Sequence, residues 1–470
     1  MRRRRTFGAV AIAATLLGHP AGAAAPPQQD AILAAFIQGA LGARPELSQA
    51  RADVQVAQER VAQAQAMPDP VLQVGVQNDS FNQWQVGTME SSWVLFMASQ
   101  TFPFPGKRGL RAELASTEVR DRELATERVR LQTIAEVRRA YLAVQLAGAR
   151  LELLAKLRGL IEQSIAVAEA RYEIGEGVQS DLLRARLELA RLQQQRLQVE
   201  ANGRLQAQAL NRLRAAPLDE RIDGAPPFAA LSFPPIPDEA ASLSTFREQS
   251  PEVLSTAIGV LRAERARALS DRSYYPDLSV SAGVMVRGSL EPMWTVTVGV
   301  PLPVFAGDKQ SRAVAEAEAL RASASRGSDA LEQLLRLRIH QRIEYWGALE
   351  QMWQAYQGGL LKEAEAASES TLTQYRVGKV AFTSVLEASS TAISAIDASY
   401  SVLAEAWRLA IAHDELSLTE SGSGGGVVGT GALGGGGASM SAARGGAASG
   451  SASSTVEIGG PASEGRPAGM

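Results

Sequence analysis

The five residues Arg171-Tyr172-Glu173-Ile174-Gly175 return later in the chain as Gln374-Tyr375-Arg376-Val377-Gly378. Both stretches place a tyrosine three residues before a glycine, at the end of a long run of helix-forming residues. Glycine adopts the positive φ that ends a helix tightly, so each stretch predicts a turn between two helices. The spacing of the two turns indicates an internal repeat with a period of roughly 200 residues.

Three further pairs of motifs recur at a similar spacing. They are Arg44-Pro45-Glu46-Leu47 with Ser250-Pro251-Glu252-Val253, Met67-Pro68-Asp69 with Tyr275-Pro276-Asp277, and, more loosely, Phe102-Pro103-Phe104-Pro105-Gly106-Lys107 with Val300-Pro301-Leu302-Pro303 and Gly307-Asp308-Lys309. The sequence therefore predicts a duplicated unit, with a first repeat over 24–230 and a second over 231–420. Each repeat is expected to contain a helix, a strand hairpin, a long helix, a glycine turn and another helix.

Long helices are expected to fill most of each repeat. Residues 107–171 contain no proline, and apolar residues recur there at steps of three and four. The same pattern predicts helices over 107–171, 180–214, 307–374 and 383–418. Each helix carries an apolar stripe that a neighbour must cover, so the helices are expected to form long antiparallel hairpins.

Two short regions of each repeat alternate with a period of two, as strands do. The predicted strands cover about 71–79, 91–102, 277–287 and 293–301; Trp93, Leu95 and Met97 share one face of the second. Roughly nine to eleven residues is the length that a tilted transmembrane strand needs. The tryptophans near the strand ends suit a membrane interface. From the pattern alone, a soluble hairpin with one buried face remains an equal alternative.

Four strands cannot close a barrel, and an open edge in lipid would leave backbone groups without hydrogen bonds. The smallest closed barrels have about eight strands, so a membrane barrel would need at least two chains, and three chains would supply twelve strands. The membrane interpretation therefore requires an oligomer, although this argument does not fix the number of copies.

The composition excludes several functional classes. The 470 residues include no cysteine and three histidines, and the formal net charge is −3. Thiolate and histidine-rich metal sites are excluded, and the charge argues against a nucleic-acid partner. With no nucleophile elbow, zinc-binding histidine pair or phosphate loop, we expect no enzyme activity, cofactor or metal site. His340 and His413 are expected on helix surfaces.

The two ends of the chain differ from the repeats. Arg2–Arg5, a short apolar core and Ala21-Gly22-Ala23 predict a cleaved export signal over residues 1–23. Residues 421–470 are rich in glycine, alanine and serine, and they predict a disordered tail because they cannot bury enough apolar surface.

Taken together, residues 30–418 resemble the TolC-type outer-membrane factors, the exit ducts of Gram-negative tripartite efflux systems. The duplicated tyrosine-glycine turns and the two strand hairpins with proline-rich exits carry the resemblance. Residues Gln100–Arg111 are most similar to the branch that serves heavy-metal pumps of the RND type. Many family members carry a lipidated N-terminal cysteine; this chain has none, so its barrel alone would hold it in the outer membrane.

The resemblance implies a mainly α fold with a transmembrane β-barrel. Three protomers with four β-strands each would form the barrel in outer-membrane lipid, and the helical hairpins would form a periplasmic α-barrel. It implies passive conduction of substrate, with heavy-metal cations as a candidate, from an inner-membrane RND-type pump. A periplasmic adaptor would dock on the turns at Tyr172, Gly175, Tyr375, Val377 and Gly378.

In the family, an acidic ring closes the periplasmic mouth on the helix after the second turn. The matching positions here are Ser384 and Glu387, so one usual acid is replaced by serine. Three copies of Glu387 near an axis would repel one another and favour cations. Asp181 and Tyr375 would add polar contacts that hold the mouth shut. Two other functions stay open: an exit duct for type I protein secretion, and a periplasmic coiled-coil scaffold that forms no channel.

Overall fold

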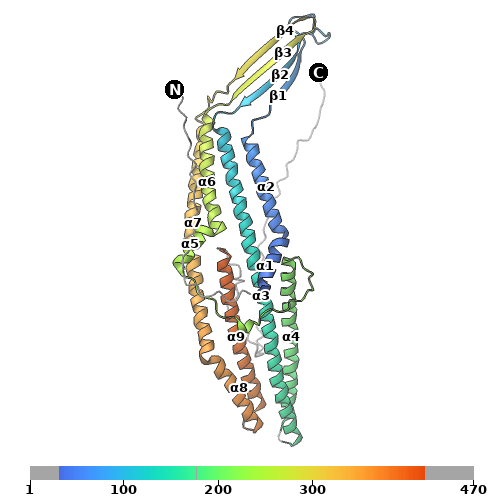
Figure 1. Ribbon diagram of the computed structural model, residues 1–470, viewed down its shortest axis with the longest axis vertical. Coiled ribbons are helices and arrows are strands. Elements are labelled where there is room, and N and C mark those ends of the chain that lie inside the picture. The colour runs from blue at the N-terminus through green and yellow to red at the C-terminus, as the bar shows by residue number, and fades with distance from the viewer. Residues whose placement is uncertain (1–30, 176, 419–470) are drawn as a thin grey trace, which may run out of the picture. The chain divides into compact units, whose positions relative to one another are not determined.

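The computed structural model of the protein describes residues 31–175 and 177–418 (Figure 1). The described residues belong to one compact unit. The predicted export signal and the predicted tail from residue 421 onward lie outside the described residues, and the structure therefore does not test them.

One layer of helices adjoins the sheet. It consists of α2 (Pro45–Gln65), α3 (Lys107–Glu173), α6 (Pro251–Asp271) and α7 (Gln310–Ala355), and each of these helices packs against the next. The short helix α1 (Ala31–Ala43) packs on α3, and α5 (Glu239–Gln249) packs on α6 and α7. The order α2, α3, α6, α7 leaves α2 and α7 at the two edges of the layer (Figure 1).

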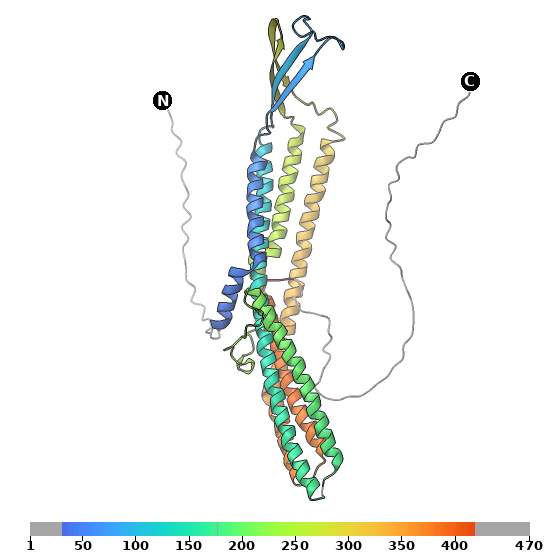
Figure 2. The ribbon, with the colours of Figure 1, turned by 90° about the vertical axis from the view of Figure 1, so that its right-hand side faces the viewer.

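A second group of helices leads away from the sheet. Helix α4 (Gln179–Leu213) packs on α3, and α8 (Leu361–Arg376) packs on α9 (Phe382–Asp414), which itself contacts α3 and α7. Because α3 takes part in both groups, it connects the sheet to the turn at Gly175 (Figure 2). Short 3-10 helices lie at Phe228–Ala230 and Arg272–Tyr274.

The core follows the length of α3. Around its middle, Leu142 and Leu146 pack with Leu403 and Ile411 of α9 and with Phe228 of the short 3-10 helix Phe228–Ala230. Nearer the turns, Leu153, Leu154, Leu157 and Ile161 of α3 pack with Leu192 of α4 and Ile393 of α9. The apolar positions spaced by three and four residues thus face neighbouring helices, as the sequence predicts.

Four antiparallel strands form one sheet in the order β1 (Val71–Gln77), β2 (Trp93–Phe102), β3 (Leu278–Arg287) and β4 (Leu290–Gly299). The register aligns Val74 with Phe96, Phe96 with Val284, and Val284 with Trp294. Side chains in register share a face of the sheet. The strands agree with the predicted ranges to within a few residues.

One face of this sheet is almost wholly apolar. Apart from Gln100, its paired positions are Leu72, Val74, Val76, Val94, Phe96, Ala98, Phe102, Leu278, Val280, Ala282, Val284, Val286, Trp294, Val296 and Val298. Nothing in the described chain covers it: Leu72 is 72% exposed and Trp294 79%. The other face carries polar side chains from every strand, namely Gln73, Gln77, Ser99, Thr101, Ser279, Ser281, Thr295 and Thr297. Trp93, Leu95 and Met97 share this second face, so in β2 it is Val94, Phe96 and Ala98 that join the apolar face.

Two sequence-based expectations need correction. The helix predicted over 307–374 is interrupted by a π turn at Tyr356–Leu360, where Gly359 is not helical, because adjacent glycines weaken a helix. His413 is not a helix-surface residue. Its ring packs against Phe246 and Trp346, at 5.4 and 6.3 Å between ring centres, and burial lowers its pKa with help from Arg342, against the opposing effect of Asp414. His340 does lie on the surface.

Among residues 31–175 and 177–418, no helix combines the length and apolar character needed to cross a bilayer. Within the same ranges, histidine and acidic side chains form no cluster of three or more that could hold a metal ion.

Candidate functional site

Each glycine turn is built from the same backbone contacts. The N–H of Gly175 donates to the carbonyl oxygen of Tyr172 at 3.0 Å, and the N–H of Gly378 donates to that of Tyr375 at 2.9 Å. The φ angles of the two glycines are +78° and +76°, in the left-handed region that side chains disfavour. The predicted turns are therefore present, and both glycines have the conformation that their sequence position indicates.

The side chain of Tyr375 lies inside the chain. It is 3% exposed and packs with Ala168 of α3, Ala185 of α4, and Phe382 and Val385 of α9. Its ring meets Phe382 edge-on, with ring centres 5.6 Å apart. The second turn is thereby fixed against the helices of the first. A buried ring offers no surface to a partner, so only the other four turn residues stay in the docking prediction.

Arg171 joins the two turns and was not predicted as a site residue. Its Nη1 donates to the carbonyl oxygen of Tyr375 at 3.0 Å, and its guanidinium lies 5.4 Å from the centre of the Tyr375 ring. The guanidinium thus satisfies a carbonyl at the C-terminus of α8, where a cation is favoured. One signal in the sequence could have indicated it, namely a cationic residue directly before the turn tyrosine of the first repeat.

Asp181 lies close enough to the second turn to act on Tyr375. It stands in the first turn of α4, where the helix N-terminus favours a carboxylate. Burial raises the pKa of the Tyr375 phenol, the charge of Asp181 raises it further, and Arg171 opposes both. The structure thus brings Asp181, Tyr375 and Arg171 together, which joins two of the predicted site residues to one that was missed.

Ser384 and Glu387 occupy a different place. They stand one helical turn apart on α9, with Ser384 half-buried and Glu387 exposed. Phe382 and Val385 are buried, so Glu387 lies on the opposite side of the helix from the core. Its carboxylate makes no ion pair with any residue in the described ranges. An exposed, unpaired carboxylate attracts cations, which is the chemistry expected of a residue at a cation-conducting mouth.

Apolar side chains are exposed on both turns. Tyr172 is 50% exposed, and Ile174, Val178 and Val377 are each more exposed than that. Ile174 and Val178 were missed, because turn sequences are usually polar and no pattern marks an apolar turn residue as uncovered. These four apolar side chains are uncovered in the part of the chain that the structure describes.

A model of the outer membrane efflux protein family matches residues 36–216 and 243–410. By sequence, no curated protein matches the chain. Several solved structures share its fold. The outer-membrane channel OprN superimposes with a TM-score of 0.69 at 16% identity, covering 82% of this chain and 90% of OprN. VceC of Vibrio cholerae superimposes with a TM-score of 0.68 at 19% identity, covering 83% of this chain and 97% of VceC. CusC superimposes with a TM-score of 0.68 at 17% identity, covering 83% of this chain and 91% of CusC. At these identities the structures establish a shared fold.

Proposed function

Since the chain belongs to the outer membrane efflux protein family, we propose that three copies form an exit duct through the outer membrane of a Gram-negative cell. The family and its structural relatives are channels, which agrees with the expectation that this chain is not an enzyme. Each copy would supply four strands to a twelve-stranded barrel and its helices to a tunnel in the periplasm.

The apolar face of the sheet is the observation that carries this proposal. In water, an uncovered face of this size would drive aggregation, whereas in a barrel it would face lipid while the polar face lines the lumen. The edge strands β1 and β4 have unpaired backbone groups, which only closure with further strands can satisfy in lipid. A coiled-coil scaffold in the periplasm would give neither feature a role.

The turns supply the rest of the proposal. Tyr172, Gly175, Val377 and Gly378, together with Ile174 and Val178, would dock a periplasmic adaptor that connects the duct to an inner-membrane RND-type pump. Glu387 would line the mouth as an acidic ring, and Asp181 and Tyr375 would hold the adjoining helices in place. Heavy-metal cations are the proposed substrate, on the strength of the motif Gln100–Arg111.

Conductance in a planar bilayer, with native mass measurement in detergent, tests this function. We expect a trimer and a cation-selective current, and Glu387→Gln should lower the cation-to-anion permeability ratio. Glu369→Gln is the matched control, because Glu369 is also exposed but lies on α8, before the second turn. A monomer without current would exclude the duct. If the protein is a trimer that conducts current, but Glu387→Gln leaves the cation-to-anion permeability ratio unchanged, only the acidic mouth is excluded.

A further inference from the structure

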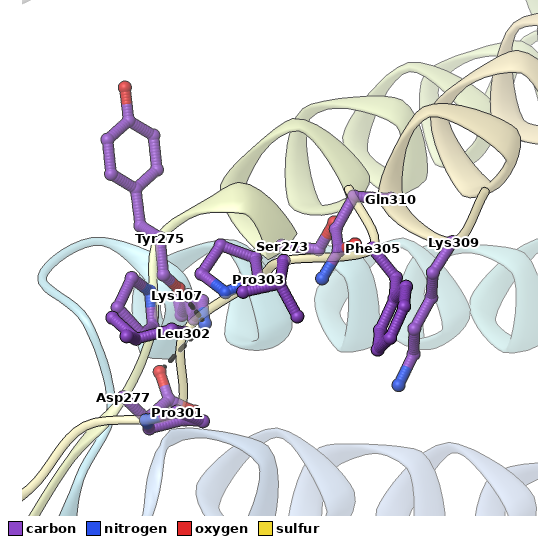
Figure 3. Close-up of a pocket in the computed structure, with 12 residues that line it drawn as sticks. Lys107, Ser273, Tyr275, Asp277, Pro301, Leu302, Pro303, Phe305, Lys309 and Gln310 are labelled. Atoms are coloured by element: carbon purple, nitrogen blue, oxygen red, sulfur yellow. Dashed lines mark hydrogen bonds and ion pairs between the residues drawn. The ribbon is translucent and has the colours of Figure 1, made fainter. Parts of the chain in front are cut away.

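A partly buried ion pair joins the two strand hairpins at the point where they meet the helices. Lys107, the first residue of α3, donates from Nζ to Oδ1 of Asp277 at 2.7 Å and to the carbonyl oxygen of Tyr275 at 2.6 Å. The backbone N–H of Phe104 donates to the same Asp277 oxygen at 2.8 Å. The rings of Phe104 and Tyr275 stack with centres 4.6 Å apart. This internal junction joins the end of β2 to the start of β3 (Figure 3).

The charge of Asp277 is held in place by these contacts. Burial alone would raise its pKa, but the hydrogen bonds from Lys107 and from the Phe104 N–H outweigh burial and lower the pKa below its ordinary value. The carboxylate is therefore ionised near neutral pH. Lys107 is 9% exposed, so the pair is a partly buried, charge-assisted contact and not a loose surface pair.

The repeated motifs provide a second set of the same groups. Asp69 follows Met-Pro as Asp277 follows Tyr-Pro, and Lys309 directly precedes α7 as Lys107 begins α3. Both Asp69 and Lys309 are exposed, and neither has an ion-pair partner among the described residues. In Figure 3, Lys309 extends beside Phe305 and away from Asp277.

Asp69 and Lys309 belong to opposite edges of the protomer. Asp69 lies between α2 and β1, and Lys309 between β4 and α7, which are the outer helices and strands of their layers. Strands β2 and β3 separate the two edges, so the residues belong to different junctions. Met67 and Leu302, which occupy the positions of Tyr275 and Phe104, are 39% and 73% exposed. Each edge thus carries one half of a junction: a charge and an apolar side chain, both uncovered.

We propose that a second copy of this chain completes the junction, with Asp69 of one copy paired to Lys309 of the next and Met67 against Leu302. The contact would repeat, between subunits, the ion pair that Lys107 and Asp277 make inside each subunit. The opposite charges and the two uncovered apolar residues favour a copy of the chain as the occupant. The inference rests on the proposed assembly, because it needs β1 and β4 of neighbouring copies to meet.

Cysteine cross-linking tests the contact, since the native chain has no cysteine. The double variant Asp69→Cys/Lys309→Cys, treated with a short bismaleimide, should give covalent dimers and trimers under denaturing conditions. Lys107→Cys/Asp277→Cys should give only monomers linked within the chain. Arg51→Cys/Lys309→Cys is the distance control, because Arg51 lies about 20 Å from the end of α2 that is nearest Asp69, at about 1.5 Å per residue. It should give little cross-linked product.

Charge exchange provides a second test that does not depend on cysteine chemistry. Asp69→Lys and Lys309→Asp should each lower the temperature at which the oligomer dissociates, because each places like charges at the junction. The double variant Asp69→Lys/Lys309→Asp should recover most of that loss. Equal losses that simply add in the double variant would contradict the pairing.

The outcomes separate the inference from the function beneath it. If the wild-type protein is a trimer but the Asp69→Cys/Lys309→Cys chains link no better than the distance control, the inference is wrong and the duct stands. If native mass measurement finds only monomers of the wild-type protein, the proposed assembly itself fails. Variants that have lost the wild-type helical circular dichroism are judged by the charge exchange alone.

Discussion

The two glycine turns have the same backbone conformation but differ in how far their tyrosine side chains are exposed. Gly175 and Gly378 have nearly the same φ, and each donates to the carbonyl of a tyrosine three residues earlier. Yet Tyr172 is 50% exposed and Tyr375 is 3% exposed. Local sequence therefore sets the shape of a turn, while the helices packed around it decide which side chain is buried.

The difference has a structural origin in the neighbours of each ring. Tyr375 is enclosed by residues of α3, α4 and α9, and Arg171 lies over its ring. The first turn has no such enclosure among the described residues, so Tyr172 stays available to a partner. One turn thus anchors the helix ends, while the ring of the other is left exposed, as the proposed docking of an adaptor requires.

The largest difference in stability between the two turns is expected when each tyrosine ring is removed in a separate variant. Tyr375→Ala should destabilise the turn region by about 3–5 kcal/mol, because it empties a buried aromatic site. Tyr172→Ala should change stability by less than about 0.5 kcal/mol, as surface substitutions usually do. Amide hydrogen exchange of the segments around both turns measures the local opening free energies. Equal losses in the two variants would contradict the comparison.

Substitution of Arg171 should have the second-largest effect on stability, because the contacts of this side chain are with the buried tyrosine turn. Arg171→Met keeps the length of the side chain but loses the hydrogen bond to the Tyr375 carbonyl, a charge-assisted contact worth about 1.5–3 kcal/mol. Gln374→Met, at the matching position of the second repeat, should be close to neutral, because among the described residues the side-chain amide of Gln374 bonds only to Ser370. Thermal unfolding followed by circular dichroism compares the two variants, and a larger loss for Gln374→Met would count against the role of Arg171.

Substitutions of the two glycines should differ in their effect on stability by less than the variants above do. A methyl group on either one costs about 1–2 kcal/mol, because both occupy the left-handed region. At Gly378 the added Cβ would also lie 3.1 Å from Nη2 of Arg171, whereas at Gly175 it would meet open space. Gly378→Ala should therefore be the more destabilising of the two by urea denaturation. The opposite ranking would mean that Arg171 moves aside without loss.

Raising the pH into the alkaline range should have the smallest effect on stability. The pKa of the Tyr375 phenol is raised above its ordinary value of 10.0, first by burial and then by the charge of Asp181. Stability from the neutral phenol is thus fully present below pH 10 and is lost as the pH rises toward the folded-state pKa. Against Tyr375→Phe, which cannot ionise, the wild type should lose stability as the pH rises above about 10. Parallel stability curves for the two proteins would rule out this titration.

The sequence predicted the long elements well, because local patterns determine them. The first long helix was expected over 107–171 and spans Lys107–Glu173, and the four strands lie close to their predicted ranges. The break at Gly358 and Gly359 was missed because the prediction treated proline as the only helix breaker in that stretch. Two adjacent glycines carry a cost of about 1 kcal/mol each relative to alanine, enough to mark a kink.

The site was predicted less completely, since its contacts join distant segments. Asp181 and Tyr375 came from the family resemblance, and the structure brings them near each other. Arg171 acts on Tyr375 across 204 residues of chain. The burial of Tyr375 could not be predicted, because a repeat shows that two positions match but not which neighbours each one meets.

Helix α3 also sets the order in which the chain can finish folding. Arg128, in the first third of this helix, donates to Oγ of Ser417, a residue 289 positions later, and the apolar face around Leu142 packs on α9. A chain that emerges from its N-terminus exposes that face until nearly the last described residue has arrived. The first half therefore cannot be completed during synthesis and must be kept from aggregating until the second half reaches it.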